Sequence, residues 1–65
     1  MEVKIIKEQG IENKIYFEVT PKSIEYQNTL LFGIEKEGNI NNEDDMIILR
    51  AEVMILASDE FDKQL

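Results

Sequence analysis

The chain has 65 residues, of which 43% are hydrophobic, and it carries a net charge of −7 at pH 7 with no cysteine and no histidine. These numbers allow one small acidic domain spanning residues 1–65, exclude a disulfide framework, and leave a structural zinc site without its usual ligands. The hydrophobic fraction is too high for a disordered acidic tail, so we expect the chain to fold.

Two strands are expected at the start of the chain. Apolar and charged residues alternate over residues 2–8 and again over residues 14–20, which is typical of strands with one buried face. A turn signal at Gly10 separates the two segments, so they form a hairpin. Pro21 lacks an amide hydrogen and ends the second strand, which leaves residues 22–28 as a connection with room for one helical turn.

A third strand is expected over residues 29–37, where apolar residues again alternate. Gly33 in the middle of this segment indicates a bulge or the close approach of another backbone. Residues 38–45 are polar and rich in Asn, Asp and Glu, which is typical of an exposed turn joining the third strand to the next element.

Residues 46–57 have two interpretations. As a helix, the segment would have Asn42 as N-cap and acidic residues 43–45 in its first turn, where they complement the helix dipole. Its only polar residues, Arg50 and Glu52, would then point about 200° apart on the helix. On a strand they would share one face. We therefore favour a strand, with the helix as the alternative.

The predicted fold is mainly β, an antiparallel sheet of about four strands. A short C-terminal helix starting near Ser58 is an optional addition that would carry Phe61 and Leu65 back onto the sheet. A strand over residues 46–57 would be apolar on both faces, and one short helix cannot cover a four-stranded sheet. We therefore expect a homodimer packed sheet on sheet, which would also add stability to so small a chain.

The sequence predicts no enzyme, no catalytic residues, no metal site and no cofactor. The commonest general base and the best nucleophile, His and Cys, are both missing. Asn39, Asn41 and Glu43 have the spacing of the start of an EF-hand loop, but Asp44 and Arg50 stand where that loop needs glycine and glutamate. Unspecific binding of hard cations by the neighbouring carboxylates is the remaining alternative.

Membrane insertion and direct nucleic-acid binding are not expected. The longest apolar run, residues 53–57, has five residues where about 20 are needed to cross a bilayer. The N-terminal residues alternate in polarity and lack the apolar stretch of a signal peptide, so a cytoplasmic location is expected. The chain has no Gly-rich phosphate loop, and its net negative charge would repel nucleic acid.

The charge of the chain is segregated, and this predicts a basic partner. Residues 1–22 contain four acidic and four basic residues, whereas residues 23–65 contain ten acidic and three basic ones. A one-sided negative field steers basic surfaces toward it. We therefore predict a non-enzymatic binding protein that docks on a basic protein surface. The predicted contact residues are Glu35, Glu37, Glu43, Asp44, Asp45, Asp59, Glu60 and Asp62.

In size, charge and β content the chain resembles the short acidic inhibitors encoded by phages and mobile elements. That resemblance implies an inhibitor that occupies the nucleic-acid groove of a host enzyme by imitating the phosphate backbone. The competing interpretation is that excess acid only improves solubility. An alternative function is that of a structural or assembly subunit that binds itself or a partner through an apolar sheet face formed by Met46, Ile48, Met54 and Leu56.

Overall fold

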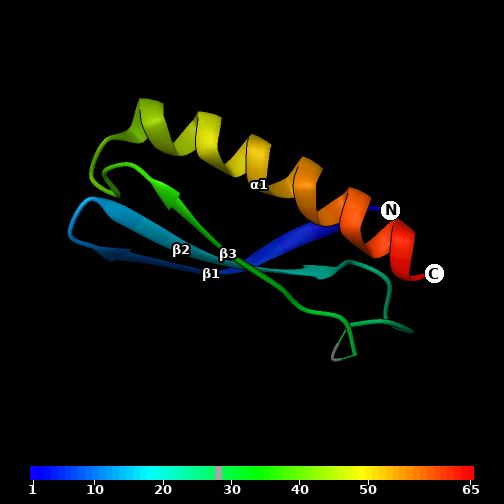
Figure 1. The fold of residues 1–65 in the computed structure, drawn as a ribbon. Helices are drawn as coiled ribbons and strands as arrows, with labels where there is room; N and C mark the ends of the chain where they lie inside the picture. The colour runs from blue at the N-terminus through cyan, green and yellow to red at the C-terminus, as the bar shows by residue number, and fades with distance from the viewer. Residues whose placement is uncertain (28) are drawn as a thin grey trace.

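A computed structural model describes residues 1–27 and 29–65 of the protein. The elements follow in the order β1 (Val3–Ile11), β2 (Lys14–Pro21), β3 (Phe32–Glu37) and α1 (Glu43–Gln64). The three strands form one antiparallel sheet in the order β1-β2-β3, and α1 lies along one face of it (Figure 1). The antiparallel sheet is confirmed, whereas a mainly β fold of four strands is wrong, because the predicted fourth strand is a long helix.

The predicted hairpin is confirmed, and β1 extends further than expected, to Ile11. Its register with β2 shifts between Ile5 and Lys7, which inserts one extra residue into β1. Because alternate residues of a strand point to opposite faces, this bulge places Glu8 on the same face of the sheet as Ile5, the face that α1 covers. The turn after β1 contains Glu12 with a φ of 56°, in the left-handed region.

The segment between β2 and β3 differs in detail from the prediction. It contains a turn in which the amide of Gln27 donates to the carbonyl of Ser23 at 3.0 Å. The last residue of the predicted connection, Asn28, lies outside the described residues. β3 begins at Phe32, and its Gly33 pairs in regular register with β2. There is no bulge at this glycine, and what approaches it is the hydroxyl of Tyr16, 2.8 Å from where a Cβ would stand.

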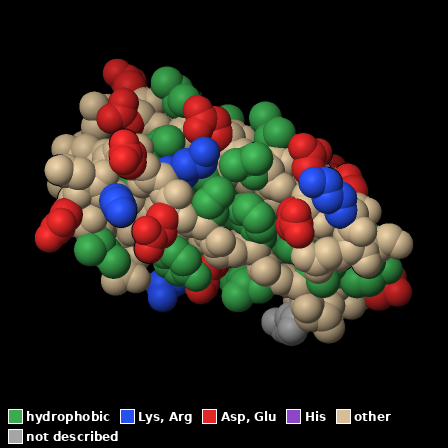
Figure 2. All heavy atoms as spheres, in the orientation of Figure 1, with side chains coloured by type: hydrophobic (Ala, Val, Ile, Leu, Met, Phe, Trp, Pro, Cys, Tyr) green, Lys and Arg blue, Asp and Glu red, His purple; other side chains and the backbone are tan. Residues whose placement is uncertain are grey.

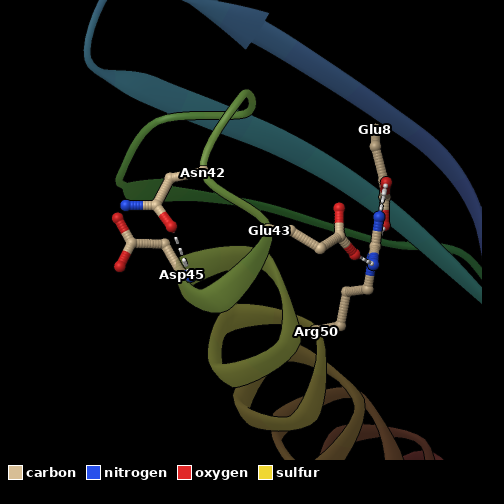
Figure 3. Close-up of polar contacts among 5 residues, drawn as sticks. All are labelled: Glu8, Asn42, Glu43, Asp45 and Arg50. Atoms are coloured by element: carbon tan, nitrogen blue, oxygen red, sulfur yellow. Dashed lines mark hydrogen bonds and ion pairs between the residues drawn. The ribbon is translucent and has the colours of Figure 1, made fainter.

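The strand prediction for residues 46–57 is wrong, and its helical alternative is correct. Asn42 is the N-cap of α1, and its side chain accepts a hydrogen bond from the amide of Asp45 at 3.2 Å (Figure 3). Glu43, Asp44 and Asp45 occupy the first turn, where negative charge complements the helix dipole.

The two polar residues that favoured a strand form ion pairs with opposite edges of the sheet. Arg50 reaches across to Glu8 of β1, with its Nε 2.6 Å from the carboxylate. Glu52 reaches Lys36 of β3 at 3.5 Å. Since β1 and β3 are the two edges of the sheet, side chains that diverge by about 200° on a helix can each reach one of them. The angle of about 200° between the two side chains, which counted against a helix, therefore allows α1 to form an ion pair with each edge of the sheet.

The hydrophobic core lies between α1 and the sheet. From the sheet it contains Ile15, Phe17 and Val19, all fully buried. From α1, the buried residues are Met46, Val53, Ala57 and Phe61. The predicted return of the C-terminal segment to the sheet is half confirmed, because Phe61 is buried, whereas Leu65 is 63% exposed.

The premise of a sheet-on-sheet dimer no longer applies, because no strand of the described residues has two apolar faces that need covering. One face of the sheet packs against α1, and the other carries mixed polar and apolar side chains. Among the described residues, no helix has both the length and the apolar character needed to cross a membrane.

Candidate protein-binding surface

The predicted acidic contact residues lie in three separate groups. Glu35 and Glu37 are on β3 and face away from α1, because their neighbours Ile34 and Lys36 face it. A second group, residues 43–45, forms the first turn of α1. The third group is Asp59, Glu60 and Asp62, near the end of the same helix.

These groups do not form one patch. The two groups on α1 are separated by about 24 Å along the helix axis, since each residue adds about 1.5 Å. The pair on β3 points to the opposite face of the sheet. Figure 2 accordingly shows acidic side chains spread over the visible surface, with basic side chains between some of them. The structure therefore keeps the three groups apart, and within the third group Glu60 and Asp62, two positions apart on α1, point about 200° from each other.

Most of these carboxylates have no cation beside them. Glu43 accepts a hydrogen bond from Arg50 Nη1 at 3.1 Å, and Asp62 lies 3.2 Å from the amino nitrogen of Met1. Within residues 1–27 and 29–65, no lysine or arginine nitrogen lies within 4.0 Å of the remaining six, which are Glu35, Glu37, Asp44, Asp45, Asp59 and Glu60. None of the six forms an ion pair, but basic residues lie near two of them: Lys14 is the cross-strand neighbour of Glu37, and Lys63 follows Asp59 by four residues on α1. The charge of the six is therefore only partly offset and can attract a basic partner.

Arg50 is a structural residue at the edge of this surface. Its Nε and Nη2 donate to the two oxygens of Glu8 at 2.6 and 3.0 Å, and its Nη1 donates to Glu43 (Figure 3). The hydrogen bonds to these two carboxylates raise the pKa of Arg50 above its usual value, against a smaller lowering by burial. The guanidinium is therefore always charged, and it fixes the rotation of α1 relative to β1. Glu43 is engaged in this contact, unlike Asp44 and Asp45.

The far face of the sheet carries a small polar cluster around Tyr16. The hydroxyl of Tyr16 donates to Glu18 at 2.7 Å, and Lys7 Nζ lies 5.8 Å from the centre of the ring. The hydrogen bond to Glu18 raises the pKa of Tyr16, with further contributions from burial and from the charges of Glu18 and Glu35. Glu35 and Glu37 therefore stand at the border of a cluster in which acidic and basic groups are mixed.

The predicted apolar contact residues do not share a face. Met46 is buried in the core, and Met54 is half-buried against it. Ile48 and Leu56 are 59% and 41% exposed and, eight positions apart, lie about 80° from each other around α1, whereas Met46 and Met54 pack toward the core. The prediction of a common face was wrong because it assumed a strand, and residues two positions apart on a helix diverge by about 200°.

A different apolar surface is present that the sequence pattern did not reveal. Ile47, Ile48 and Ile55 are 60%, 59% and 63% exposed, and Ala51 between them is also exposed. We call these four residues the outer face of α1. They follow the spacing i, i+1, i+4 and i+8, which places them on one side of a helix, opposite the core. This spacing is present in the sequence and identifies the face once the segment is assigned as helix.

Carboxylates stand at both ends of the outer face. Asp44 precedes Ile48 by four residues, and Asp59 follows Ile55 by four, so all four lie along one side of the helix. The described residues contain no group of three or more His, Cys, Asp or Glu side chains that could hold a metal ion. The arrangement is suited to binding a macromolecular surface, because it is long, apolar in the middle and negative at each end.

Compared with protein-family models, curated proteins and solved structures, the chain has no match in any of the three. Its function is therefore inferred from the surface itself.

Proposed function

We propose that this protein is a non-enzymatic binding protein of the cytoplasm that docks, through its acidic side chains, on a basic surface of another protein. The observation that carries the proposal is the set of six predicted contact carboxylates without a cation within 4.0 Å among the described residues. A carboxylate in an ion pair must lose its partner before it can bind another, whereas these six form no ion pair among the described residues. Such charges mainly increase the rate and the specificity of association.

The partner we propose is a protein whose basic surface normally binds nucleic acid, so that docking inhibits it. Glu35 and Glu37 support this form of the proposal, because they are two residues apart on one face of β3 and so about 6.6 Å apart along the strand. Phosphates of one nucleic-acid strand follow each other at a comparable separation. The remaining unpaired carboxylates lie on α1 and form separate negative surfaces on the other side of the sheet.

A second candidate function is that of an assembly subunit that forms a homodimer. The exposure of Ile47, Ile48 and Ile55 favours it, because a helix that is apolar on all sides is normally covered on all sides. A chain of this size would also gain stability from self-association.

Salt dependence separates the two candidates. The experiment is a pull-down from a cell lysate on the immobilised protein, eluted with a salt gradient, with the eluted proteins identified by mass spectrometry. We expect a basic protein that elutes steeply with rising salt and is displaced by duplex DNA. A matched variant, Glu35→Gln with Glu37→Gln, isolates the contribution of β3.

Two results would contradict the proposal. The first is retention that does not change with salt, which would indicate an apolar contact. The second is that no basic protein is retained while sedimentation of the purified protein gives twice the mass of one chain, which would favour the assembly subunit.

A further inference from the structure

We infer that the outer face of α1 is a docking site for an amphipathic helix of a partner protein, one with an apolar middle and lysine or arginine at both ends. This inference rests on the proposed function and specifies where the basic partner binds and what shape it has.

The outer face has the form of a helix-docking surface. Along one side of α1 stand Asp44, Ile48, Ala51, Ile55 and Asp59, separated by four, three, four and four residues. This is the spacing at which side chains of one helix interlock with those of another. Ala51 lies in the middle and is small, which allows a second helix to approach closely there.

The charges at the two ends select the partner. Asp44 and Asp59 are about 22 Å apart along the axis, and within the described residues neither has a lysine or arginine nitrogen within 4.0 Å. Because the charge at both ends has the same sign, a complementary helix needs basic residues at both of its ends, about 15 residues apart. A partner helix with a single basic end would leave one aspartate without a counter-charge.

The same charges disfavour a second copy of the chain as the occupant. If two α1 helices pack antiparallel about Ala51, Asp44 of one lies opposite Ser58 and beside Asp59 of the other. If they pack parallel, each aspartate faces its own copy. Either arrangement brings like charges together at both ends of the contact, which is destabilising. Charge complementarity therefore favours a basic partner over a homodimer at this face.

The test uses the full chain and synthetic helical peptides of about six turns. The probe peptide has leucines at alternating three- and four-residue spacing in its middle and two lysines at each end. One control peptide has glutamates in place of the lysines, and another has the same composition with the leucines scrambled. Binding is measured by fluorescence anisotropy of the labelled peptide at low and high salt.

We expect the lysine-ended peptide to bind, with weaker binding at high salt, and both control peptides to bind at least about tenfold more weakly. Ile48→Gln and Ile55→Gln should each weaken binding about tenfold, because both side chains would lie at the centre of the contact. Asp44→Asn and Asp59→Asn should each weaken it severalfold at low salt and little at high salt. Since these side chains are exposed, circular dichroism of each variant should match that of the parent chain.

The matched control is Glu12→Gln with Glu25→Gln, which also removes two exposed carboxylate charges but lies outside α1 and outside the predicted contact residues, and it should leave the affinity unchanged. If Glu35→Gln with Glu37→Gln abolishes binding while the four α1 variants do not, the inference is overturned and the proposed function stands. If no basic peptide binds and no basic protein is captured from lysate, both fail. The purified chain could instead form a dimer that becomes tighter at high salt and that dissociates when Ile55 is changed to Gln. That result would assign the outer face to self-association and overturn the inference.

Discussion

Removing the N-cap of α1 is expected to destabilise the protein measurably, because the side chain of Asn42 accepts a hydrogen bond from an amide of the first turn that has no partner within the helix. In Asn42→Ala the hydrogen bond from the amide of Asp45, 3.2 Å long and exposed, is lost. Loss of an N-cap costs about 1 kcal/mol. A chain of this length has a total stability of roughly 3–10 kcal/mol, so the melting temperature should fall by about 4–8 °C. Thermal unfolding followed by far-ultraviolet circular dichroism measures this fall.

Two further variants make the assignment specific. The side chain of Asn41, the neighbouring residue, makes no hydrogen bond among the described residues, so Asn41→Ala should leave the melting temperature nearly unchanged. Asn42→Ser retains a side-chain oxygen at the N-cap and should recover most of the loss. If Asn41→Ala and Asn42→Ala lower the melting temperature equally, or if neither does, the helix does not begin at the residue described.

Three other predictions concern the core, the loop and the far face of the sheet. Phe61→Ala should lower the free energy of unfolding by about 3–5 kcal/mol, because this side chain is fully buried. A urea titration should then find the chain largely unfolded. Gly38→Ala should lower the free energy of unfolding by less than about 1 kcal/mol in the same titration, since its Cβ would stand 2.6 Å from Cδ1 of Leu49, the end of a flexible side chain that can move aside, and a loss of several kcal/mol would contradict this. Glu18→Gln should lower the pKa of Tyr16 toward its ordinary value of 10.0 in an NMR titration of the ring. Because the pKa of Tyr16 is raised, the folded state favours the neutral hydroxyl more than the unfolded state does. The stability that this preference adds is complete below about pH 10 and is lost as the pH rises through the pKa of the folded state.

The hairpin could be predicted because alternation of apolar and polar residues matches the two-residue period of a strand and not the period of a helix. Ile15, Phe17 and Val19 were correctly placed on one buried face of a strand. The bulge in β1 lies where the alternation breaks, at the consecutive apolar residues Ile5 and Ile6, but this break alone does not distinguish a bulge from an apolar residue on the outer face of a regular strand.

The helix was missed because its sequence is apolar on nearly all sides. One side packs against the sheet and the opposite side carries Ile47, Ile48 and Ile55 exposed, so the segment lacks the polar face by which an amphipathic helix is recognised. Its capping signal at Asn42 was correct and was outweighed by the positions of Arg50 and Glu52. Only the sheet reveals that these two side chains have partners on opposite edges.

The sequence names the carboxylates of the candidate site but does not give their arrangement in space. Composition identified an acidic surface, and most of the named carboxylates are without a nearby cation among the described residues. Their division into three groups follows from the fold, because β3 and the two ends of α1 point in different directions. The apolar outer face between two of those groups depends on the helical period, so it could not be found from a strand assignment.

The measurement that tests the central claim most directly is methyl NMR of the isoleucines while the lysine-ended helical peptide is added. The docking site on α1 predicts that the methyl signals of Ile47, Ile48 and Ile55 shift together and saturate at one affinity. The signal of Ile24, which is 89% exposed in the connection after β2, should not move. Shifts confined to residues of the sheet, with the three α1 isoleucines unchanged, would contradict the claim that the partner binds along this helix.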